Sequence, residues 1–262
     1  MTRTLALTQS QKQERARVLL ERLKVAIPDA RCELIYFSHF QLLVSVVLSA
    51  KNTDKQVNKV MQPLYEAGFT PETVLAWGEA GLLQRIRSIG LAPTKAKNVH
   101  NLSRILQEQH GGQVPSKHEE LVALPGVGRK TANVVMAELF QHPSLAVDTH
   151  VYRVTYRLGL QDTNSADKAE RELLKVIDPS YLPGAHHLFL LHGRYVCKAI
   201  KPTCTDCVLK DLCPHASLEA KLLPKPKTKA KAKKKVLKKP FKPGSKAPRA
   251  SRGDRSPARA SL

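Results

Sequence analysis

Helical periodicity is the feature that most constrains the fold of this chain. Apolar residues recur at helical spacing through most of the first 220 residues, and start and stop signals separate the runs. Ser38 with Gln41 three residues later forms a capping-box pattern, and Gly68 ends the run that starts at Thr53 or Asp54. Alternating strand patterns and Asn-Gly hairpins are nearly absent. The sequence therefore predicts an all-α protein of about nine or ten helices.

Two local expectations can be checked against the structure. The segment 70–90 reads as two short helices that are broken near Gly81. Pro115 and Ser116 are expected at the start of the helix that precedes the glycine pair of residues 126 and 128.

Charge is distributed unevenly along the 262 residues. The chain has 43 Lys and Arg against 22 Asp and Glu, which gives a net charge of +21. Residues 221–262 contain 16 of the basic residues and only one acidic residue. Residues 219–262 are rich in Lys, Pro and Ala and cannot bury a core, so this basic tail is predicted to be disordered. A basic body and tail indicate a polyanionic partner, commonly nucleic acid, although a like-charge run can also be merely solvated.

The sequence shows no sign of secretion or membrane insertion. Residues 1–23 are polar and periodic, and no apolar run approaches the roughly 20 residues that span a bilayer. We therefore expect a reducing compartment: the cytoplasm or nucleoid if the source is bacterial, with nuclear import also compatible with the lysine-rich tail. Cysteines in such a compartment are more often ligands or catalytic groups than disulfides.

Four cysteines indicate a metal site. Cys197, Cys204, Cys207 and Cys213 follow the spacing C-x6-C-x2-C-x5-C, and three of them lie in a polar loop. Four thiolates this close could bind zinc or an iron–sulfur cluster, and spacing alone leaves both open. Cys32 stands apart beside apolar residues and is expected to be a core thiol.

The stretch LPGVGRKTANVV places a glycine hairpin between two predicted helices. A nucleotide-binding loop needs Gly directly before its Lys, whereas Arg129 separates Gly128 from Lys130. Gly126, Val127, Gly128 and Arg129 would instead present backbone N–H groups at a helix N-terminus, which binds phosphate without reading base sequence. An ordinary helix turn is the alternative.

These motifs together resemble one family. LPGVGRKTANVV, AVDTHVYRV, HHLFLLHGRYVC and the cysteine spacing are similar to the endonuclease III family of DNA glycosylases, over roughly residues 12–218. The resemblance implies one 4Fe–4S cluster rather than zinc. It also implies a two-lobed fold, with a central helical domain at 32–141 that contains a helix–hairpin–helix at about 118–137. Residues 1–31 plus 142–218 would form the cluster domain.

The resemblance also implies the chemistry. Family members act in base excision repair as bifunctional DNA glycosylases and AP lyases on oxidised pyrimidines, so the expected partner is double-stranded DNA with such bases or abasic sites, bound by a monomer. Lys130 matches the nucleophile that attacks C1′, forms a Schiff base and cleaves 3′ to the site by β-elimination. The amine must be neutral, and partial shielding at a helix N-terminus disfavours the ammonium form. Asp148 matches the carboxylate that stabilises positive charge near C1′, with a helix N-cap as its alternative role.

Five further residues are expected to contact DNA. Leu91 matches a wedge that fills the space left by an extruded nucleotide. Lys51 occupies the plug position, where the family commonly has Gln, and it has no amide to pair with the orphaned base. His150 is expected near the interlobe cleft, with a purely structural role as the alternative. Lys198 and Lys201 lie between cysteines and are expected to contact phosphates.

Two rival interpretations can be weighed. An adenine-removing mismatch glycosylase shares the cysteine spacing, but that family lacks the lysine and carries a folded C-terminal domain. The tail of this chain is too short and too biased in composition to form such a domain. A non-catalytic DNA-binding module would not need Lys130 and Asp148 together, 18 residues apart. Three histidines could suggest a second metal site: His186, His187 and His192. They lie in the predicted helix that precedes Cys197, which favours packing against the cluster domain instead.

Overall fold

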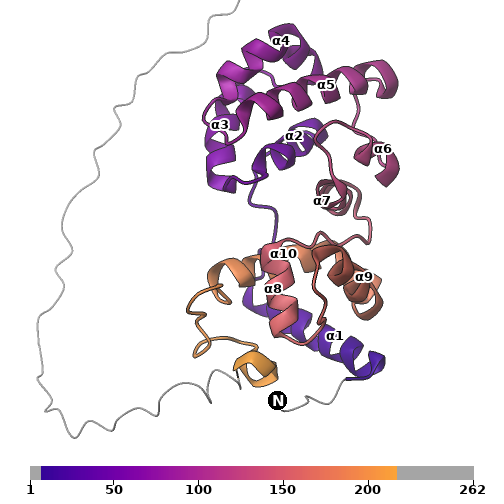
Figure 1. Cartoon of the computed structure of the whole chain (residues 1–262), viewed down its shortest axis with the longest axis vertical. Helices are drawn as coiled ribbons and strands as arrows, with labels where there is room; N and C mark the ends of the chain where they lie inside the picture. The colour runs from indigo at the N-terminus through magenta and orange to yellow at the C-terminus, as the bar shows by residue number, and fades with distance from the viewer. Residues whose placement is uncertain (1–6, 217–262) are drawn as a thin grey trace, which may run out of the picture. The chain divides into compact units, whose positions relative to one another are not determined.

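The computed structural model describes residues 7–216, so the basic tail lies outside the described residues. Within this range the chain forms α-helices and short 3-10 helices and no strand, which confirms the all-α prediction (Figure 1). The elements are α1 (Gln9–Ala26), α2 (His39–Ser49), α3 (Asp54–Glu66), α4 (Pro71–Ile86), α5 (Ala92–His110), α6 (His118–Val122), α7 (Arg129–Phe140), α8 (Thr149–Arg157), α9 (Ala166–Val176), η1 (Pro179–Tyr181), α10 (Leu182–Tyr195) and η2 (Lys210–Leu212). None of the described helices combines the length and apolar character that a bilayer crossing needs.

Side-chain caps start several of these helices. The Ser38 hydroxyl accepts the N–H of Gln41 at 3.2 Å, as the sequence pattern predicts. The expected capping box is only half formed, because the Gln41 side chain accepts the N–H of Phe37 instead of that of the cap residue. Thr53, not Asp54, caps α3 by accepting the N–H of Gln56.

Two predicted helix boundaries were wrong. The break in α4 lies at Gly78, three residues before Gly81, because Gly78 has φ +64° and ψ 174°, which glycine adopts without the steric cost of a side chain. The helix before the hairpin starts at His118 with Lys117 as its cap, so Pro115 and Ser116 precede it instead of opening it.

Two hydrophobic cores organise the described residues. One core is formed by the helices from α2 through α7 and includes Leu43, Val47, Met61, Leu102 and Val135. The other contains side chains from α1 and from helices after residue 144, including Leu19, Leu23, Val154, Leu173 and Phe189. Figure 1 shows α1 beside α9 and α10, although it comes first in the sequence. These separate cores support our proposed division at 31/32 and 141/142.

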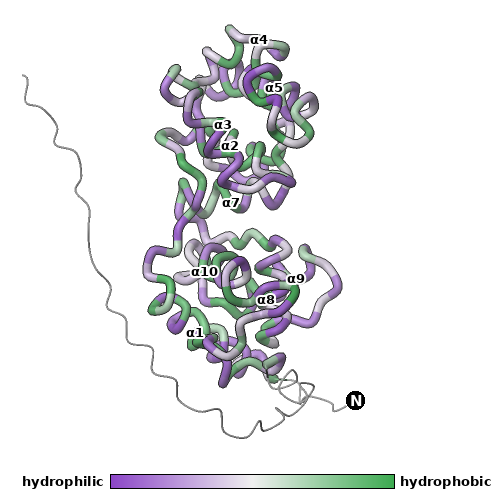
Figure 2. Tube along the Cα trace, turned by 90° about the vertical axis from the view of Figure 1, so that its left-hand side faces the viewer, coloured by the Kyte–Doolittle hydropathy of each residue, from purple (hydrophilic) through white to green (hydrophobic). Residues whose placement is uncertain are grey.

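Amphipathic helices build both cores. Hydrophobic and hydrophilic residues are interleaved along the helices in Figure 2. The buried face of α1 consists of Ala16, Leu19, Leu20 and Leu23, and burying each leucine contributes about 1.5–3 kcal/mol. In contrast, α2 is buried along almost its entire length, from Phe40 to Leu48. Residues 49–51 at the end of this buried helix line a cavity, so the packing of α2 fixes one wall of that cavity.

Candidate active site

The hairpin between α6 and α7 is held from the inside. Gly126 has φ +81°, and a Cβ there would lie 3.0 Å from the Asn98 side chain. The Val127 side chain is buried, and its N–H donates to the carbonyl of Leu124 at 3.0 Å. Gly128 is the N-cap of α7 and supplies no side-chain bond, so no side chain at the cap position covers the first-turn N–H groups.

Lys130 is the second residue of α7, and its exposed side chain lies at the edge of a cavity. The expected partial shielding of this amine is therefore not supplied by the protein alone. Neighbouring Arg129 pairs instead with Glu170 of α9 at 2.8 Å, and this partner raises the pKa of Arg129. The Arg129 guanidinium thus ties the hairpin to the second core.

Asp148 is the N-cap of α8. Its Oδ1 accepts the N–H of Val151 at 2.7 Å, and the residue also lines the same cavity as Lys130. The two roles weighed for Asp148 in the sequence are therefore compatible, because capping occupies one carboxylate oxygen and the residue still lines the cavity.

The cavity shared by Lys130 and Asp148 has a volume of about 290 Å³. Lys51 and His150 also line it, so four of the predicted site residues meet there. Leu91, Lys198 and Lys201 do not belong to its lining. The fold thus brings an amine of α7 and a carboxylate at the start of α8 to one space that is large enough for a small heterocycle.

Three further residues line this cavity without any sign in the sequence that they belong to it: Asp54, Arg194 and His186. Burial raises the pKa of Asp54, Asp148 raises it further, and Lys130 lowers it, so these charges interact. Arg194 of α10 bonds to Asp54 at 2.9 Å and also pairs with Glu33. The sequence indicates Asp54 only as a possible helix start, and its partner lies 140 residues away.

Lys51 and Leu91 occupy the tips of two linked loops. Both have left-handed backbones, with φ of 58° and 64°, and the Leu91 side chain is 58% exposed. Asn52 joins the loops by accepting the N–H of Gly90 at 2.9 Å. The buried Lys95 ammonium donates to two carbonyl groups at the end of α2, each at 2.7 Å. These contacts fix where an exposed apolar tip and an exposed cation stand.

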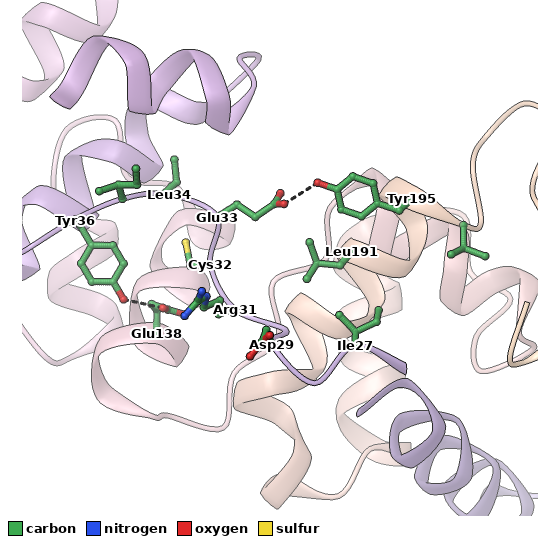
Figure 3. Close-up of a pocket in the computed structure, with 12 residues that line it drawn as sticks. Ile27, Asp29, Arg31, Cys32, Glu33, Leu34, Tyr36, Glu138, Leu191 and Tyr195 are labelled. Atoms are coloured by element: carbon green, nitrogen blue, oxygen red, sulfur yellow. Dashed lines mark hydrogen bonds between the residues drawn. The ribbon is translucent and has the colours of Figure 1, made fainter. Parts of the chain in front are cut away.

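A larger cavity, of about 790 Å³, lies beside the first and shares the segment 31–34 with it. Figure 3 shows the hydrogen bond between Tyr36 and Glu138 and the Cys32 thiol near this pair. The Tyr36 hydroxyl donates to Glu138 at 2.7 Å. Burial raises the pKa of the Cys32 thiol to about 12, as expected for a core thiol. The lining of this cavity includes no amine, so the smaller cavity is the better candidate for chemistry despite its size.

The four C-terminal cysteines line one small cavity: Cys197, Cys204, Cys207 and Cys213. Arg157 donates to the sulfur of Cys197 at 3.4 Å, and Nε2 of His192 lies 3.8 Å from the sulfur of Cys207. Burial lowers the pKa of His192 to about 4 and raises that of the Cys207 thiol. Across residues 7–216, no three His, Cys, Asp or Glu side chains are spaced to hold one metal ion.

Arginines of α8 support the loop after Cys197. Arg153 donates to the carbonyl of Cys197 at 3.1 Å, and Arg157 donates to that of Lys198 at 2.7 Å. Lys198 and Lys201 are exposed, and Lys201 has a left-handed φ of 53°. The backbone of this loop is thus anchored while its cations face outward.

Comparisons with known proteins agree with this arrangement. A model of the HhH-GPD superfamily of base excision DNA repair proteins matches residues 44–179. Endonuclease III of Rickettsia prowazekii is 50% identical over 188 residues, which cover 72% of this chain and 89% of that protein. Endonuclease III of Escherichia coli is 44% identical over 197 residues, which cover 75% of this chain and 93% of that protein.

Solved structures show the same similarity. A trapped covalent intermediate of endonuclease III with DNA aligns at a TM-score of 0.75 and 42% identity, over 82% of this chain and 99% of that one. A non-covalent endonuclease III–DNA complex aligns at 0.76 with the same identity and coverage. A thermostable thymine-DNA glycosylase, at 22% identity and a TM-score of 0.69, shares the fold. The chain therefore belongs to the endonuclease III family, and it is a DNA-binding base excision repair enzyme, a DNA glycosylase with AP lyase activity.

Proposed function

We propose that this enzyme removes oxidised pyrimidines from double-stranded DNA and then cleaves the strand 3′ to the abasic site. The main support is that the amine of Lys130 and the carboxylate of Asp148 line one cavity. That a related endonuclease III has been trapped as a covalent intermediate with DNA fits an amine nucleophile. The enzyme would act as a monomer, because both residues come from the same chain.

The proposed reaction begins with extrusion of the damaged nucleotide, which costs a few kcal/mol. The neutral Nζ of Lys130 attacks C1′, the C1′–N bond breaks, and the base leaves with the bonding electrons and takes up a proton. The sugar ring opens to a Schiff base between Nζ and C1′. Loss of a proton from C2′ then expels the 3′ phosphate by β-elimination, and hydrolysis of the Schiff base releases Lys130.

Asp148 supplies negative charge where positive charge develops. As the base departs, C1′ becomes oxocarbenium-like, and a fixed carboxylate stabilises that charge more than it stabilises the ground state. The cap bond to Val151 holds the carboxylate in place, so little reorganisation is needed during the reaction.

The same surface would hold the DNA. Gly126, Gly128 and the first turn of α7 offer backbone N–H groups to a phosphate, and Val127 holds the turn from the inside. Leu91 would enter the base stack as a wedge, with Lys51 as the plug beside it. Lys198 and Lys201 would contact phosphates, and His150 and Arg129 would lie close to the backbone. These contacts position the duplex without reading its sequence.

We further propose that the four cysteines hold one 4Fe–4S cluster. The thiols line one cavity without the spacing that a single ion requires, as four sulfurs on four different irons would. Arg157 and His192 offer N–H groups near two of the sulfurs. When bound, the cluster would be structural, because four protein ligands leave no open position for substrate.

Metal analysis tests the cluster. Protein purified without oxygen should be yellow-brown, contain iron and absorb near ~400 nm by sulfur-to-iron charge transfer. The Cys204→Ala variant should lose most of this absorbance, whereas Cys32→Ala should keep it, because Cys32 packs in the other core. One zinc and no iron per chain would contradict the assignment.

The function itself is tested by borohydride trapping. The enzyme is incubated with a duplex containing one thymine glycol, and with the same duplex carrying an abasic site. Both should give a covalent adduct, and the first should also release the free base. On a third duplex that carries a mispaired adenine, release of adenine without an adduct on any substrate would favour the mismatch glycosylase. Binding without product on all three would favour the non-catalytic module.

A further inference from the structure

His186 has a defined tautomer in the catalytic cavity. The side chain lies on α10, is 6% exposed and lines the cavity with Lys130 and Asp148. Its Nδ1 lies 2.8 Å from the carbonyl oxygen of Ala146, and because a carbonyl oxygen can only accept, Nδ1 carries the proton. Nε2 of the neutral ring is then a hydrogen-bond acceptor.

The surroundings of His186 keep the ring neutral. Burial lowers its pKa most, and the neighbouring His187 and Lys130 also lower it, whereas Asp148 and the bond to the Ala146 carbonyl raise it. His187 meets it edge-on, with ring centroids 5.1 Å apart, and is itself held by Glu138 at 2.9 Å. The ring orientation is therefore braced on two sides, independently of its ionisation.

The acceptor of His186 is left for a ligand. No residue in the described range gives Nε2 a hydrogen bond, and the atom is not sealed from solvent. His186 lines the cavity, and an acceptor there that lacks a protein donor is suited to a ligand that brings one. A role as proton acceptor for Lys130 fits poorly, because an imidazole whose charged form is disfavoured is a weak base.

We propose that Nε2 of His186 accepts a hydrogen bond from the ring N–H of a pyrimidine extruded into this cavity. The inference rests on the proposed function and adds a residue that holds the base. A neutral acceptor selects an N–H, whereas a cation would select a carbonyl oxygen. Thymine glycol presents N3–H on this edge, and an abasic site presents nothing, so the contact should affect base removal and not the lyase step.

Two variants separate the acceptor from its support. Asn at this position can keep a donor near the carbonyl of Ala146, but it does not reach the site of Nε2. Gln can place an amide oxygen near that site. His186→Asn should slow single-turnover release of thymine glycol about 10- to 100-fold, because the base N–H loses its partner. His186→Gln should retain more of the rate.

A modified substrate tests the same contact in the unaltered enzyme. Thymine glycol methylated at N3 has no ring N–H on this edge, and the wild type should release it about 10- to 100-fold more slowly than the parent base. In His186→Asn the difference between the two substrates should largely disappear. This coupling is expected of a direct contact and not of a general loss of structure.

The abasic-site duplex distinguishes the possible failures. If the wild type forms no adduct there, the proposed function is wrong. If adducts form but His186→Asn releases thymine glycol at the wild-type rate, the role of His186 is wrong. Equal losses of base release and abasic-site trapping, or indifference of the wild type to N3 methylation, would also overturn the contact with the base.

Discussion

Lys130→Ala is expected to form no borohydride-stable adduct with abasic DNA and to lose strand cleavage by at least about 10³-fold. The reason is that the nucleophilic amine is removed, and no solvent molecule can form a Schiff base in its place. Duplex affinity should change by less than about threefold, because the hairpin backbone and not this side chain would grip the phosphates. Trapping and a binding titration on the same abasic duplex measure both quantities.

Lys51→Ala is the matched control for this variant. Lys51 is a second exposed amine that lines the same cavity, so it is the natural candidate if the nucleophile has been misassigned. Lys51→Ala should still form the adduct at saturating enzyme. An adduct that persists in Lys130→Ala and is lost in Lys51→Ala would assign the nucleophile to Lys51 instead.

Features set by local sequence could be predicted well. Helix existence followed from periodicity and caps, because a cap bond joins residues only three positions apart, as Ser38 and Gln41 are. The hairpin followed from Gly126, whose positive φ and close approach to Asn98 both require a residue without a side chain. The shared cavity of Lys130 and Asp148 was implied by the family resemblance, and their short separation in sequence keeps both on adjacent helices.

Features that depend on distant partners could not be predicted. Asp54 faces Arg194 from 140 residues away, and nothing in the segment around Thr53 marks it as more than a helix start. His186 was expected to pack, and it does, but its tautomer depends on the carbonyl of Ala146, 40 residues earlier. The exposure of Lys130 depends on which other residues surround the mouth of the cavity. These come from distant parts of the sequence, so the exposure could not be predicted from the residues near Lys130.

Asp148→Asn is expected to slow single-turnover base release about 10²- to 10³-fold while leaving stability nearly unchanged. The substitution removes the negative charge that would stabilise the oxocarbenium-like state at C1′. It keeps an oxygen that can accept the N–H of Val151, and Asn is as good an N-cap as Asp, so unfolding free energy should shift by only a few tenths of a kcal/mol.

Asp148→Ala separates the charge from the cap. This variant should lose base release by a similar factor and, in addition, about 1 kcal/mol of stability, because Ala cannot cap α8. Asp178→Asn is the matched control: Asp178 accepts the N–H of Ser180 at 2.9 Å, is not part of the catalytic cavity, and should keep base release. Thermal denaturation and single-turnover kinetics on thymine glycol DNA give both readouts.

Normal release by Asp148→Asn, together with slow release and lower stability in Asp148→Ala, would leave Asp148 only its capping role. Slow release in both variants, with a stability loss in Asp148→Ala alone, would assign the effect on catalysis to the charge, since the cap survives in one variant and fails in the other.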